Sequence, residues 1–462
     1  MLFNSYVFIC VFLPIVVCCF FVIAKRYGRK PAQFWLVISS LFFYAWWDYR
    51  YLALLLLSIL FNYKISCQIS RKGMKKFWLV AGIAGDLCLL GWFKYAGFFA
   101  DTFNALAGAA VIDVPHVILP LGISFFTFTQ IAYLVDTYRG ETITGDVVGF
   151  FEFVTIFPHL IAGPIISHRS MHPQFMAVQS YRLDYGNIAQ GLVLFSLGLF
   201  KKVVLADSLA PWVSTIFSQA GALDFVTAWV GALGYTLQLY FDFSGYSEMA
   251  IGLGLMLNLQ FPTNFNAPYR ATSIVDFWRR WHMTLGAWVK EYLYIPLGGN
   301  RQGEIKKMRN LFLSMLLVGF WHGAGWTFIL WGGWHGLLLM INHQWRRLSI
   351  SLPRGLAWTM TFLCVVIGWV VFRANDFAGA IAYLSAMVDI HSYGSVSLIH
   401  GEVAKCFRFV LAGMLLVLLV PTPLAMMKNF TPNKKWVAAA IILFVISLLK
   451  MNEYSEFLYF QF

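Results

Sequence analysis

Long apolar runs separated by short polar breaks dominate the sequence. They lie at 5–24, 33–63, 77–99, 117–135, 147–166, 187–206, 223–257, 311–342, 357–373, 407–427 and 436–450. An α-helix needs about 20 mostly apolar residues to cross a bilayer. Two runs, 223–257 and 311–342, exceed this length and are rich in glycine, which predicts that each holds a broken helix or two spans. We therefore predict an all-α polytopic membrane protein with about 10 to 13 transmembrane helices.

The polar breaks indicate how the first helices are oriented. Cytoplasmic loops collect Lys and Arg, and the first run is followed by Lys25, Arg26, Arg29 and Lys30. The run 33–63 is interrupted only at 46–50 and ends near a second basic cluster, which predicts a tight hairpin that returns to the same side. No A-x-A cleavage site follows the first run. We expect this run to be a retained first span with an extracytoplasmic N-terminus.

Composition excludes several classes of protein. Apolar residues make up 60% of the chain and charged residues 12%, whereas soluble domains carry about 25% charged residues. A soluble enzyme, a disordered chain and a fibrous protein are thereby excluded. The net charge of +13 fits basic cytoplasmic loops, so we expect membrane lipids and no nucleic acid as partners. Seven cysteines without a CxxC pair predict neither a disulfide framework nor a zinc site.

Basic residues concentrate in one segment. Between 270 and 309 the chain holds eight Lys or Arg residues against three acids. Within 277–301, aromatic and aliphatic residues recur at three- and four-residue spacing, which predicts an amphipathic helix along the bilayer surface. Arg279 and Arg280 flank His282 and suit either the phosphates of an anionic donor such as coenzyme A or lipid head groups. The sequence favours neither alternative.

A histidine within an apolar run is the strongest candidate for chemistry. His322 follows Trp321 near the middle of 311–342, and Gly323 and Gly325 follow it closely. An ionisable side chain at that depth is costly, so it indicates function. Glycines permit a helix break and a close approach of the substrate to the backbone. The alternative is a histidine that is hydrogen-bonded between helices.

Other polar residues carry weaker signals. For His335 we expect a structural role, and His159 before a Gly-Pro pair indicates a helix end or re-entrant turn. His168 and His172 have the spacing of a metal pair but lack further ligands, so no metal site is predicted. Asp242 lies in an aromatic run and suits either a substrate-binding acid or an acid satisfied between helices.

Several long motifs resemble the membrane-bound O-acyltransferase (MBOAT) family, and in particular its bacterial exopolysaccharide-acetylation branch. The D-alanyl transfer and peptidoglycan O-acetylation membrane proteins are related to that branch. The similarity covers nearly the whole chain. The motifs are FPHLIAGPI (157–165), LQLYFDFSGYSEMAIGLGLM (237–256), NFNAPY (264–269), FWRRWHMTLGAWVKEYLYIPLGGNR (277–301) and GFWHGAGWTFILWGGWHG (319–336).

The resemblance implies a fold and a set of site residues. It implies a ring of tilted helices around a central funnel, with re-entrant or amphipathic interfacial helices. We expect one integral membrane domain over 1–462, with N-terminal helices in 1–145, the catalytic core in 146–343 and C-terminal helices in 344–462. By resemblance His322 and His282 are the catalytic residues. Donor-binding or substrate-binding roles are expected for Trp321, Asp242, Arg279 and Arg280.

The implied activity is acetyl transfer across a bacterial inner membrane. No bound cofactor is expected, and acetyl-CoA is the expected acyl donor. The acetyl group would reach an extracytoplasmic polysaccharide through a partner acetyltransferase. Peptidoglycan is the alternative polymer. Two other classes remain open at this point: a transporter or flippase of acylated lipid or polymer, which also suits broken helices, and a scaffold.

Overall fold

A computed structural model describes the chain except for residues 72, 116, 143, 393–400, 452–457 and 459–462. The described residues form helices joined by short connections, and no strand occurs among them. A bilayer offers no water to unpaired backbone groups, which favours helices that satisfy their own hydrogen bonds. The predicted all-α membrane fold is confirmed. The chain folds into two compact units.

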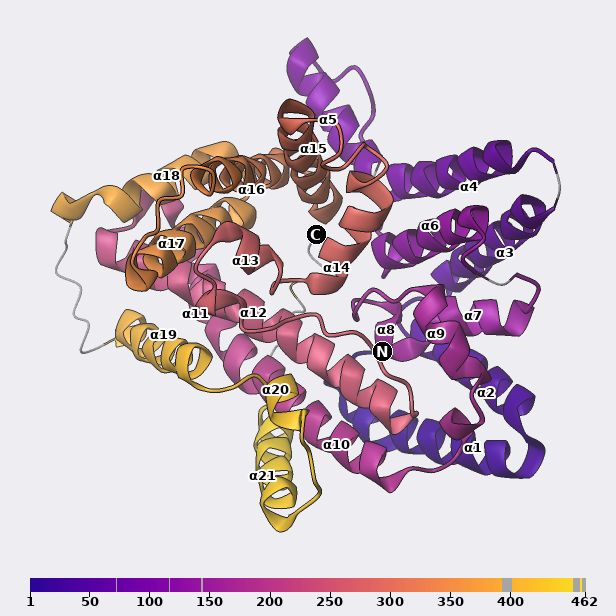
Figure 1. Ribbon diagram of the computed structural model, residues 1–462. Coiled ribbons are helices and arrows are strands. Elements are labelled where there is room, and N and C mark those ends of the chain that lie inside the picture. Colours follow the sequence, from indigo (N-terminus) through magenta and orange to yellow (C-terminus); the bar gives the residue numbers. More distant parts are fainter. Residues whose placement is uncertain (72, 116, 143, 393–400, 452–457, 459–462) are drawn as a thin grey trace. The chain divides into compact units, whose positions relative to one another are not determined.

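The first unit comprises Met1–Leu197, Tyr246–Pro262 and Asn429–Leu448. In this unit α3, α4 and α6 pack against one another, as do α1 and α2 (Figure 1). Its helices are η1 (Phe8–Phe12), α1 (Leu13–Tyr27), α2 (Arg29–Ala45), α3 (Arg50–Ser70), α4 (Lys75–Leu90), η2 (Gly91–Tyr95), α5 (Ala96–Ala107), α6 (Ile123–Arg139), α7 (Val147–Thr155), α8 (Phe157–Leu160), α9 (His168–Met176), η3 (Val178–Tyr181), most of α10 (Tyr185–Phe200), and α21 (Lys434–Lys450).

The second unit comprises Gly198–Gly245, Thr263–Lys428 and Leu449–Phe462. The hairpin of α15 and α16 packs against α17 in this unit (Figure 1). Its helices are η4 (Lys201–Ala206), α11 (Asp207–Ser218), η5 (Ala220–Ala222), most of α12 (Phe225–Met256), η6 (Pro268–Arg270), α13 (Ile274–Trp278), α14 (Met283–Val289), η7 (Lys290–Tyr294), α15 (Glu304–His322), α16 (Trp326–Trp345), α17 (Arg354–Arg373), α18 (Phe377–Val388), η8 (Ile390–Ser392), α19 (Gly401–Leu419) and α20 (Pro423–Met427).

Six helical segments among the described residues are long and apolar enough to cross a membrane. Other predicted runs form helices that are shorter or more polar, such as α6 with 17 residues. The wider count of about 10 to 13 spans stays a prediction. The six segments are Phe8–Tyr27, Arg50–Ser70, Lys75–Ala107, Tyr185–Ser218, Arg354–Arg373 and Gly401–Met427.

The predicted hairpin in 33–63 is confirmed. Helix α2 ends at Ala45 and α3 begins at Arg50. The Asp48 carboxylate accepts the Arg50 backbone N–H at 2.9 Å and pairs with the Arg50 guanidinium, which satisfies one of the free donors at the start of α3. Trp46 and Trp47 are about half exposed, as expected for an aromatic pair at a membrane interface.

The two glycine-rich runs have different structures. The run 311–342 is broken between α15 and α16, as predicted. The run 223–257 is a single 32-residue helix, α12, so the prediction of a break there is wrong. The glycines of α12 are sites of close helix packing: a Cβ at Gly245 would lie 2.7 Å from the Gly198 carbonyl oxygen, and one at Gly252 would lie 2.7 Å from that of Gly191. Small residues allow such backbone contact in membrane helices.

A glycine substitution tests the close contact between α15 and α16. A Cβ at Gly332 would lie 2.4 Å from the Met315 carbonyl oxygen and 3.1 Å from the Gly319 Cα. We expect Gly332→Ala to lower the thermal unfolding midpoint of the detergent-solubilised protein, because overpacking costs about 1–3 kcal/mol.

The neighbouring glycine is the matched control. A Cβ at Gly333 would lie 3.7 Å from a Leu316 methyl carbon, an ordinary contact. Alanine is the better helix former, so Gly333→Ala should leave the unfolding midpoint unchanged or raise it. Equal midpoints for the two variants would show that α15 and α16 are not packed this closely.

Candidate active site

The break between α15 and α16 places His322. Helix α15 ends at His322 because Gly323 is extended (φ −156°, ψ 150°), and α16 begins at Trp326. A Cβ at Gly323 would lie 2.2 Å from the Phe328 ring, so only glycine fits this turn without a shift of that ring. The glycines therefore fix where the helix stops and present the imidazole at its end.

Aromatic rings enclose the His322 imidazole. The side chain is 7% exposed. Its ring meets Trp331 edge-on at 5.2 Å between centroids and Phe372 at 5.4 Å, while the adjacent Trp321 ring lies at 4.9 Å. Edge-to-face contacts of this kind contribute about 0.5–1.5 kcal/mol each beyond burial. They hold the imidazole in one place and limit the access of water to it.

The backbone at His282 departs from the predicted helix. The segment 277–301 is not one amphipathic helix, because α13 ends at Trp278 and α14 begins at Met283. His282 adopts a left-handed conformation (φ 42°, ψ 53°). Phe277, Trp281 and Leu285 are at most 3% exposed, so their apolar pattern reflects packing within the unit. A non-glycine residue in this conformation stores roughly 1–3 kcal/mol of strain, which is common at functional sites.

Asn264 determines which His282 nitrogen carries the proton. Its Oδ1 lies 3.3 Å from the Thr284 backbone nitrogen and 2.9 Å from the Thr284 hydroxyl. A backbone N–H can only donate, so the atom facing it must be the amide oxygen. The same oxygen lies 3.0 Å from His282 Nδ1, which must therefore donate its proton. Nε2 carries the lone pair in the neutral ring.

His282 is neutral in this setting. It lies outside the six candidate spans and is 1% exposed. Burial lowers the pKa of His282 to about 3, because the charged imidazolium loses its hydration. Phe243 contacts the ring edge-on at 4.7 Å between centroids. A neutral, oriented imidazole is suited to accept a hydrogen bond.

Tryptophans connect the surroundings of the two histidines. Trp331, which contacts His322, stacks on Trp369 at 5.7 Å between centroids. Trp369 contacts Trp281 at 4.8 Å, and Trp281 precedes His282 in the chain. We call Trp281, Trp331, Trp369 and Phe372 the aromatic cluster. Both predicted catalytic histidines thus adjoin one buried cluster within the second unit.

His335 has the contacts expected of a structural histidine. It is fully buried, and its Nδ1 accepts a hydrogen bond from Trp278 Nε1 at 3.3 Å. The Trp331 ring lies 5.0 Å away, and a Cβ at Gly368 would lie 2.9 Å from His335 Nε2. His335 therefore fastens α16 to α13 and α17.

Asp242 lies in a buried ion pair. Lys202 Nζ is 2.6 Å from Asp242 Oδ1 and 2.6 Å from Asp207 Oδ1, and all three side chains are at most 8% exposed. Of the two alternatives for Asp242, this geometry is that of an acid satisfied between helices. A role in binding substrate stays a prediction.

The two arginines beside His282 differ in their surroundings. Arg280 Nε donates to Asp276 Oδ1 at 2.8 Å, so part of its charge is neutralised within the protein. Arg279 is exposed and follows the last residue of α13. Arg279 is therefore the better placed of the two for an anionic ligand, although donor binding stays a prediction for both.

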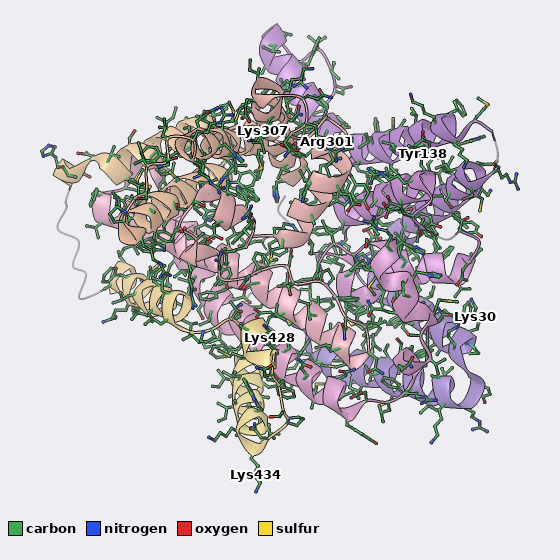
Figure 2. The ribbon with its side chains drawn as sticks, viewed as in Figure 1. Lys30, Tyr138, Arg301, Lys307, Lys428 and Lys434 are labelled. Atoms are coloured by element: carbon green, nitrogen blue, oxygen red, sulfur yellow. The ribbon has the colours of Figure 1, made fainter. Side chains whose placement is uncertain are left out.

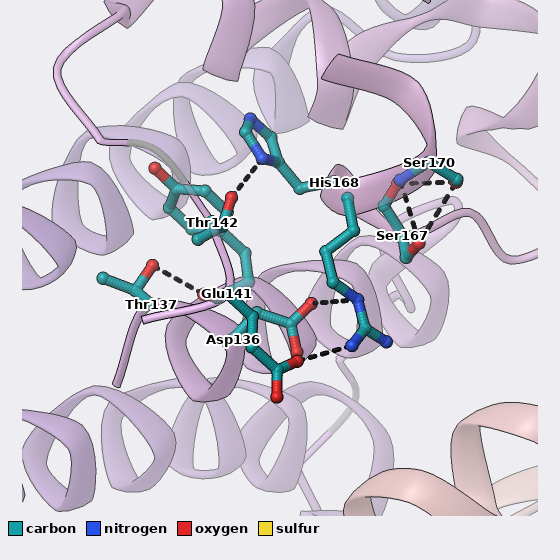
Figure 3. A network of polar contacts seen from close by, with 9 residues as sticks. Asp136, Thr137, Glu141, Thr142, Ser167, His168 and Ser170 are labelled. Atoms are coloured by element: carbon teal, nitrogen blue, oxygen red, sulfur yellow. Dashed lines mark hydrogen bonds and ion pairs between the residues drawn. The ribbon is translucent and has the colours of Figure 1, made fainter. Parts of the chain in front are cut away.

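The HRSMH segment is structural. His168 Nδ1 hydrogen-bonds the Thr142 hydroxyl, and the two histidine rings lie 5.0 Å apart. Arg169 pairs with Glu141 and lies 3.7 Å from Asp136. Figure 3 shows the bond of His168 to Thr142, together with Asp136 and Glu141 at the end of α6. The segment fastens α9 to the loop after α6.

His159 is at the end of a short helix, as predicted. It lies in the four-residue α8 and is 1% exposed. Its Nε2 donates to the Phe153 carbonyl at 3.2 Å. The two short helices α7 and α8, of nine and four residues, fit the predicted helix end or re-entrant turn.

A family comparison decides the class of protein. Residues 143–378 match the membrane-bound O-acyltransferase family, MBOAT. The chain belongs to the MBOAT family. The matched segment contains His322, His282 and the four other predicted site residues. The chain is therefore an MBOAT acyltransferase, which argues against the transporter and the scaffold.

Curated relatives narrow the branch. A peptidoglycan O-acetyltransferase of Helicobacter pylori is 45% identical over 87% of this chain and 81% of its own. A probable alginate O-acetylase AlgI of Azotobacter vinelandii is 44% identical over 91% of this chain and 84% of its own. A teichoic acid D-alanyltransferase of Bacillus subtilis is 25% identical over 57% of this chain and 71% of its own. The expected resemblance to bacterial polymer-modifying MBOAT proteins is confirmed.

Sequence reasoning missed two polar residues at this site. Asn264 lies in the NFNAPY motif, but nothing in the spacing links it to a histidine 18 positions later. The sequence does carry a signal for Lys202, because a lysine inside the apolar run 187–206 is costly in a membrane and implies an acidic partner. Asp242 and Asp207 are its partners.

The ion pair gives a graded prediction for stability. Lys202→Met leaves two buried carboxylates without their cation, which should cost about 3–5 kcal/mol and sharply reduce the yield of folded protein. Asp242→Asn should cost less, because Lys202 keeps Asp207 at 2.6 Å. Thermal unfolding of purified protein measures both. Lys405→Met is the control, since Lys405 pairs with Glu402 at 2.7 Å on the exposed surface, where an ion pair contributes little to stability. Equal loss for Lys405→Met and Lys202→Met would contradict the assignment.

Proposed function

We propose that this MBOAT acyltransferase transfers acetyl groups from cytoplasmic acetyl-CoA to an acceptor for O-acetylation of an extracytoplasmic polysaccharide, with His322 as general base. The observation that carries the proposal is the position of His322 at the glycine break of α15, enclosed by the aromatic cluster. A histidine is suited to this role because its ordinary pKa of about 6.5 allows it to take and return a proton near neutral pH.

The transfer step requires one base and one proton path. His322 takes the proton of the acceptor hydroxyl while the hydroxyl oxygen attacks the thioester carbonyl carbon. The C–S bond then breaks, an oxygen ester forms, and the thiolate of coenzyme A takes up the proton from the imidazolium. The low exposure of His322 supports this role, because excluding water limits hydrolysis of the thioester.

We assign His282 an assisting role on the cytoplasmic side. Its Nδ1 donates to Asn264, so Nε2 is the nitrogen with the lone pair that accepts a hydrogen bond. Trp321 helps to shape the path for the substrate. Arg279, and to a lesser extent Arg280, would attract the phosphates of the donor. The charge of a guanidinium and its fork of donors suit such phosphates.

A partner completes the proposed reaction. In this proposal the acetyl group is relayed to an extracytoplasmic acetyltransferase, which holds the polymer. We place the protein in the bacterial inner membrane with its N-terminus outside, because basic residues follow the first span. Relatives named for alginate and for peptidoglycan are similarly close, so peptidoglycan is the alternative polymer. Acetyl esters measured on each purified polymer, in cells with and without the gene, decide between them.

Removing the proposed base should abolish transfer. We expect His322→Ala to lower the release of labelled acetate or its transfer from acetyl-CoA by at least about 100-fold, because general-base catalysis contributes about 10²–10⁴. The yield of protein in the membrane should not change. His391→Ala is the matched control, since His391 is an exposed imidazole in the same unit. An active His322→Ala protein would overturn the assignment.

The tautomer of His282 gives a second prediction. Asn264→Ala removes the acceptor for Nδ1–H, and we expect the turnover number to fall by at least about 10-fold with little change in the KM for acetyl-CoA. Asn264→Asp keeps an acceptor oxygen and should restore part of the rate. Thr284→Val removes the hydroxyl bond to the same oxygen but leaves the His282 bond, so it is the control. The proposed role is wrong if Thr284→Val lowers the turnover number as much as Asn264→Ala does.

A further inference from the structure

A groove in the first unit carries three cations. Its volume is about 790 Å³, within the range of about 300–1,000 Å³ typical of small-molecule sites. Lys25, Arg29 and Arg182 line it, and no acidic residue does. The proposed acetyl transfer uses none of these residues. The other lining residues are Phe21, Val22, Ala24, Gly28, Met176, Val178, Tyr181, Leu183 and Tyr185.

The groove is held open by contacts within the unit. Arg29 Nη1 donates to the Met176 carbonyl at 3.4 Å, which holds the guanidinium against one wall. The Tyr181 hydroxyl donates to the Phe175 carbonyl at 2.7 Å, and the Arg182 carbonyl accepts from Asn258 at 2.5 Å. These bonds fix the backbone around Tyr181 and Arg182. Hydrogen bonds within the unit therefore hold the Arg29 guanidinium and the backbone of Arg182 in place.

Nearby acids are engaged elsewhere. Asp146 pairs with Lys30 at 3.0 Å, and Figure 2 shows Lys30 near the start of α2. Glu152 is 2% exposed and accepts a hydrogen bond from Gln33 at 2.8 Å. Asp184 accepts the Asn187 backbone N–H at 3.0 Å at the start of α10. The residues that line the groove carry a formal charge of +3, which favours an anionic ligand.

The position of the groove matches the headgroup level of a bilayer. The candidate span Phe8–Tyr27 ends beside it, and the candidate span Tyr185–Ser218 begins beside it. Five apolar lining residues, Val22, Met176, Val178, Leu183 and Tyr185, are 40–78% exposed. Such a rim is unfavourable in water, at about 25 cal/mol per Å², but suits acyl chains and the interface.

We propose that this groove binds the phosphate headgroup of an anionic phospholipid, with its acyl chains over the exposed apolar rim. The inference goes beyond the proposed acetyl transfer and does not depend on it. A free phosphate would satisfy the three cations but leave the apolar rim in water. A zwitterionic lipid would cover the rim but bring a cation toward Lys25 and Arg182. An anionic phospholipid satisfies both features, as in basic pockets between membrane helices.

Native mass spectrometry of the full-length protein tests the proposal. The purified protein is equilibrated with equal amounts of phosphatidylglycerol and phosphatidylcholine, and the bound lipids are counted. Each cation near a membrane surface contributes about 1 kcal/mol to binding of an anionic lipid, or about fivefold. The double variant Lys25→Gln/Arg182→Gln should therefore lose about 25-fold in phosphatidylglycerol retention relative to wild type.

A matched control removes the same charge elsewhere. Lys434 and Lys435 are exposed at the start of α21 in the same unit, and Figure 2 shows Lys434 at its outer end. Lys434→Gln/Lys435→Gln should keep the preference of the wild type for phosphatidylglycerol. Equal losses of phosphatidylglycerol in the two double variants would show that only the net charge of the protein matters, and would overturn the proposed site.

Two further arms identify the ligand. Inorganic phosphate and acetyl-CoA are each added in excess to the wild-type protein carrying phosphatidylglycerol. Retention of the lipid supports the proposal, whereas its displacement by either compound shows a site for free phosphate or for the donor and overturns it. Where the double variant fails to fold, the single variants Lys25→Gln and Arg182→Gln are measured. Each should lose about fivefold, and no loss in either contradicts the proposal.

Discussion

Polar side chains buried in this protein lack the bulk water that would otherwise satisfy them, so each needs a partner from the chain itself. Unpaired polar groups cost several kcal/mol in such surroundings. Asn62 donates to Asp86 at 2.7 Å, Gln33 donates to Glu152 at 2.8 Å, and Lys202 lies 2.6 Å from each of two aspartates. The bonds of Gln33 to Glu152, of Asn62 to Asp86 and of Lys202 to Asp242 join different helices, so they specify which helices are neighbours, which apolar packing alone does not.

The same constraint separates the three histidines near the aromatic cluster. His335 accepts from Trp278 and lies between helices, which is a structural role. His282 donates to Asn264 at a strained backbone position, an arrangement that orients the ring and leaves one nitrogen with a lone pair. His322 is at the end of a helix among aromatic rings, where the packing fixes its position. All three histidines are buried to a similar extent. The partners of each ring, and not its burial, therefore distinguish a structural histidine from a candidate catalytic one.

Apolar runs predicted the fold well, whereas glycine was ambiguous. The basic and aromatic break in 33–63 placed the hairpin correctly, since α2 ends at Ala45 just before it and α3 begins at Arg50, whose backbone N–H donates to Asp48. Glycine breaks a helix at Gly323 but lets α12 approach a neighbour at Gly245 and Gly252. In either role the apolar run is rich in glycine, so its composition does not tell them apart. The two roles differ only in which atoms lie where the Cβ of another residue would be. The bond from His282 to Asn264 could not be predicted either, because it depends on the left-handed backbone conformation of His282, which the sequence does not reveal.

A count of basic residues alone also overstates how many of them are available to bind the donor. The segment 270–309 holds eight basic residues, but several of them serve the structure of the second unit. Arg270 Nε donates to the Val417 carbonyl at 2.9 Å, Arg280 pairs with Asp276, and Lys307 lies 3.5 Å from Glu304.

Exposed cations remain in the same segment. Arg279 follows α13, and Arg301, seen in Figure 2 together with Lys307, precedes α15. A phosphate-bearing donor gains the most binding free energy from cations that have no carboxylate partner. A guanidinium that is already paired must first give up its own carboxylate, which costs free energy. Of the eight basic residues in 270–309, the best candidates for binding the donor are therefore the exposed ones on either side of His282 and α14, such as Arg279 and Arg301.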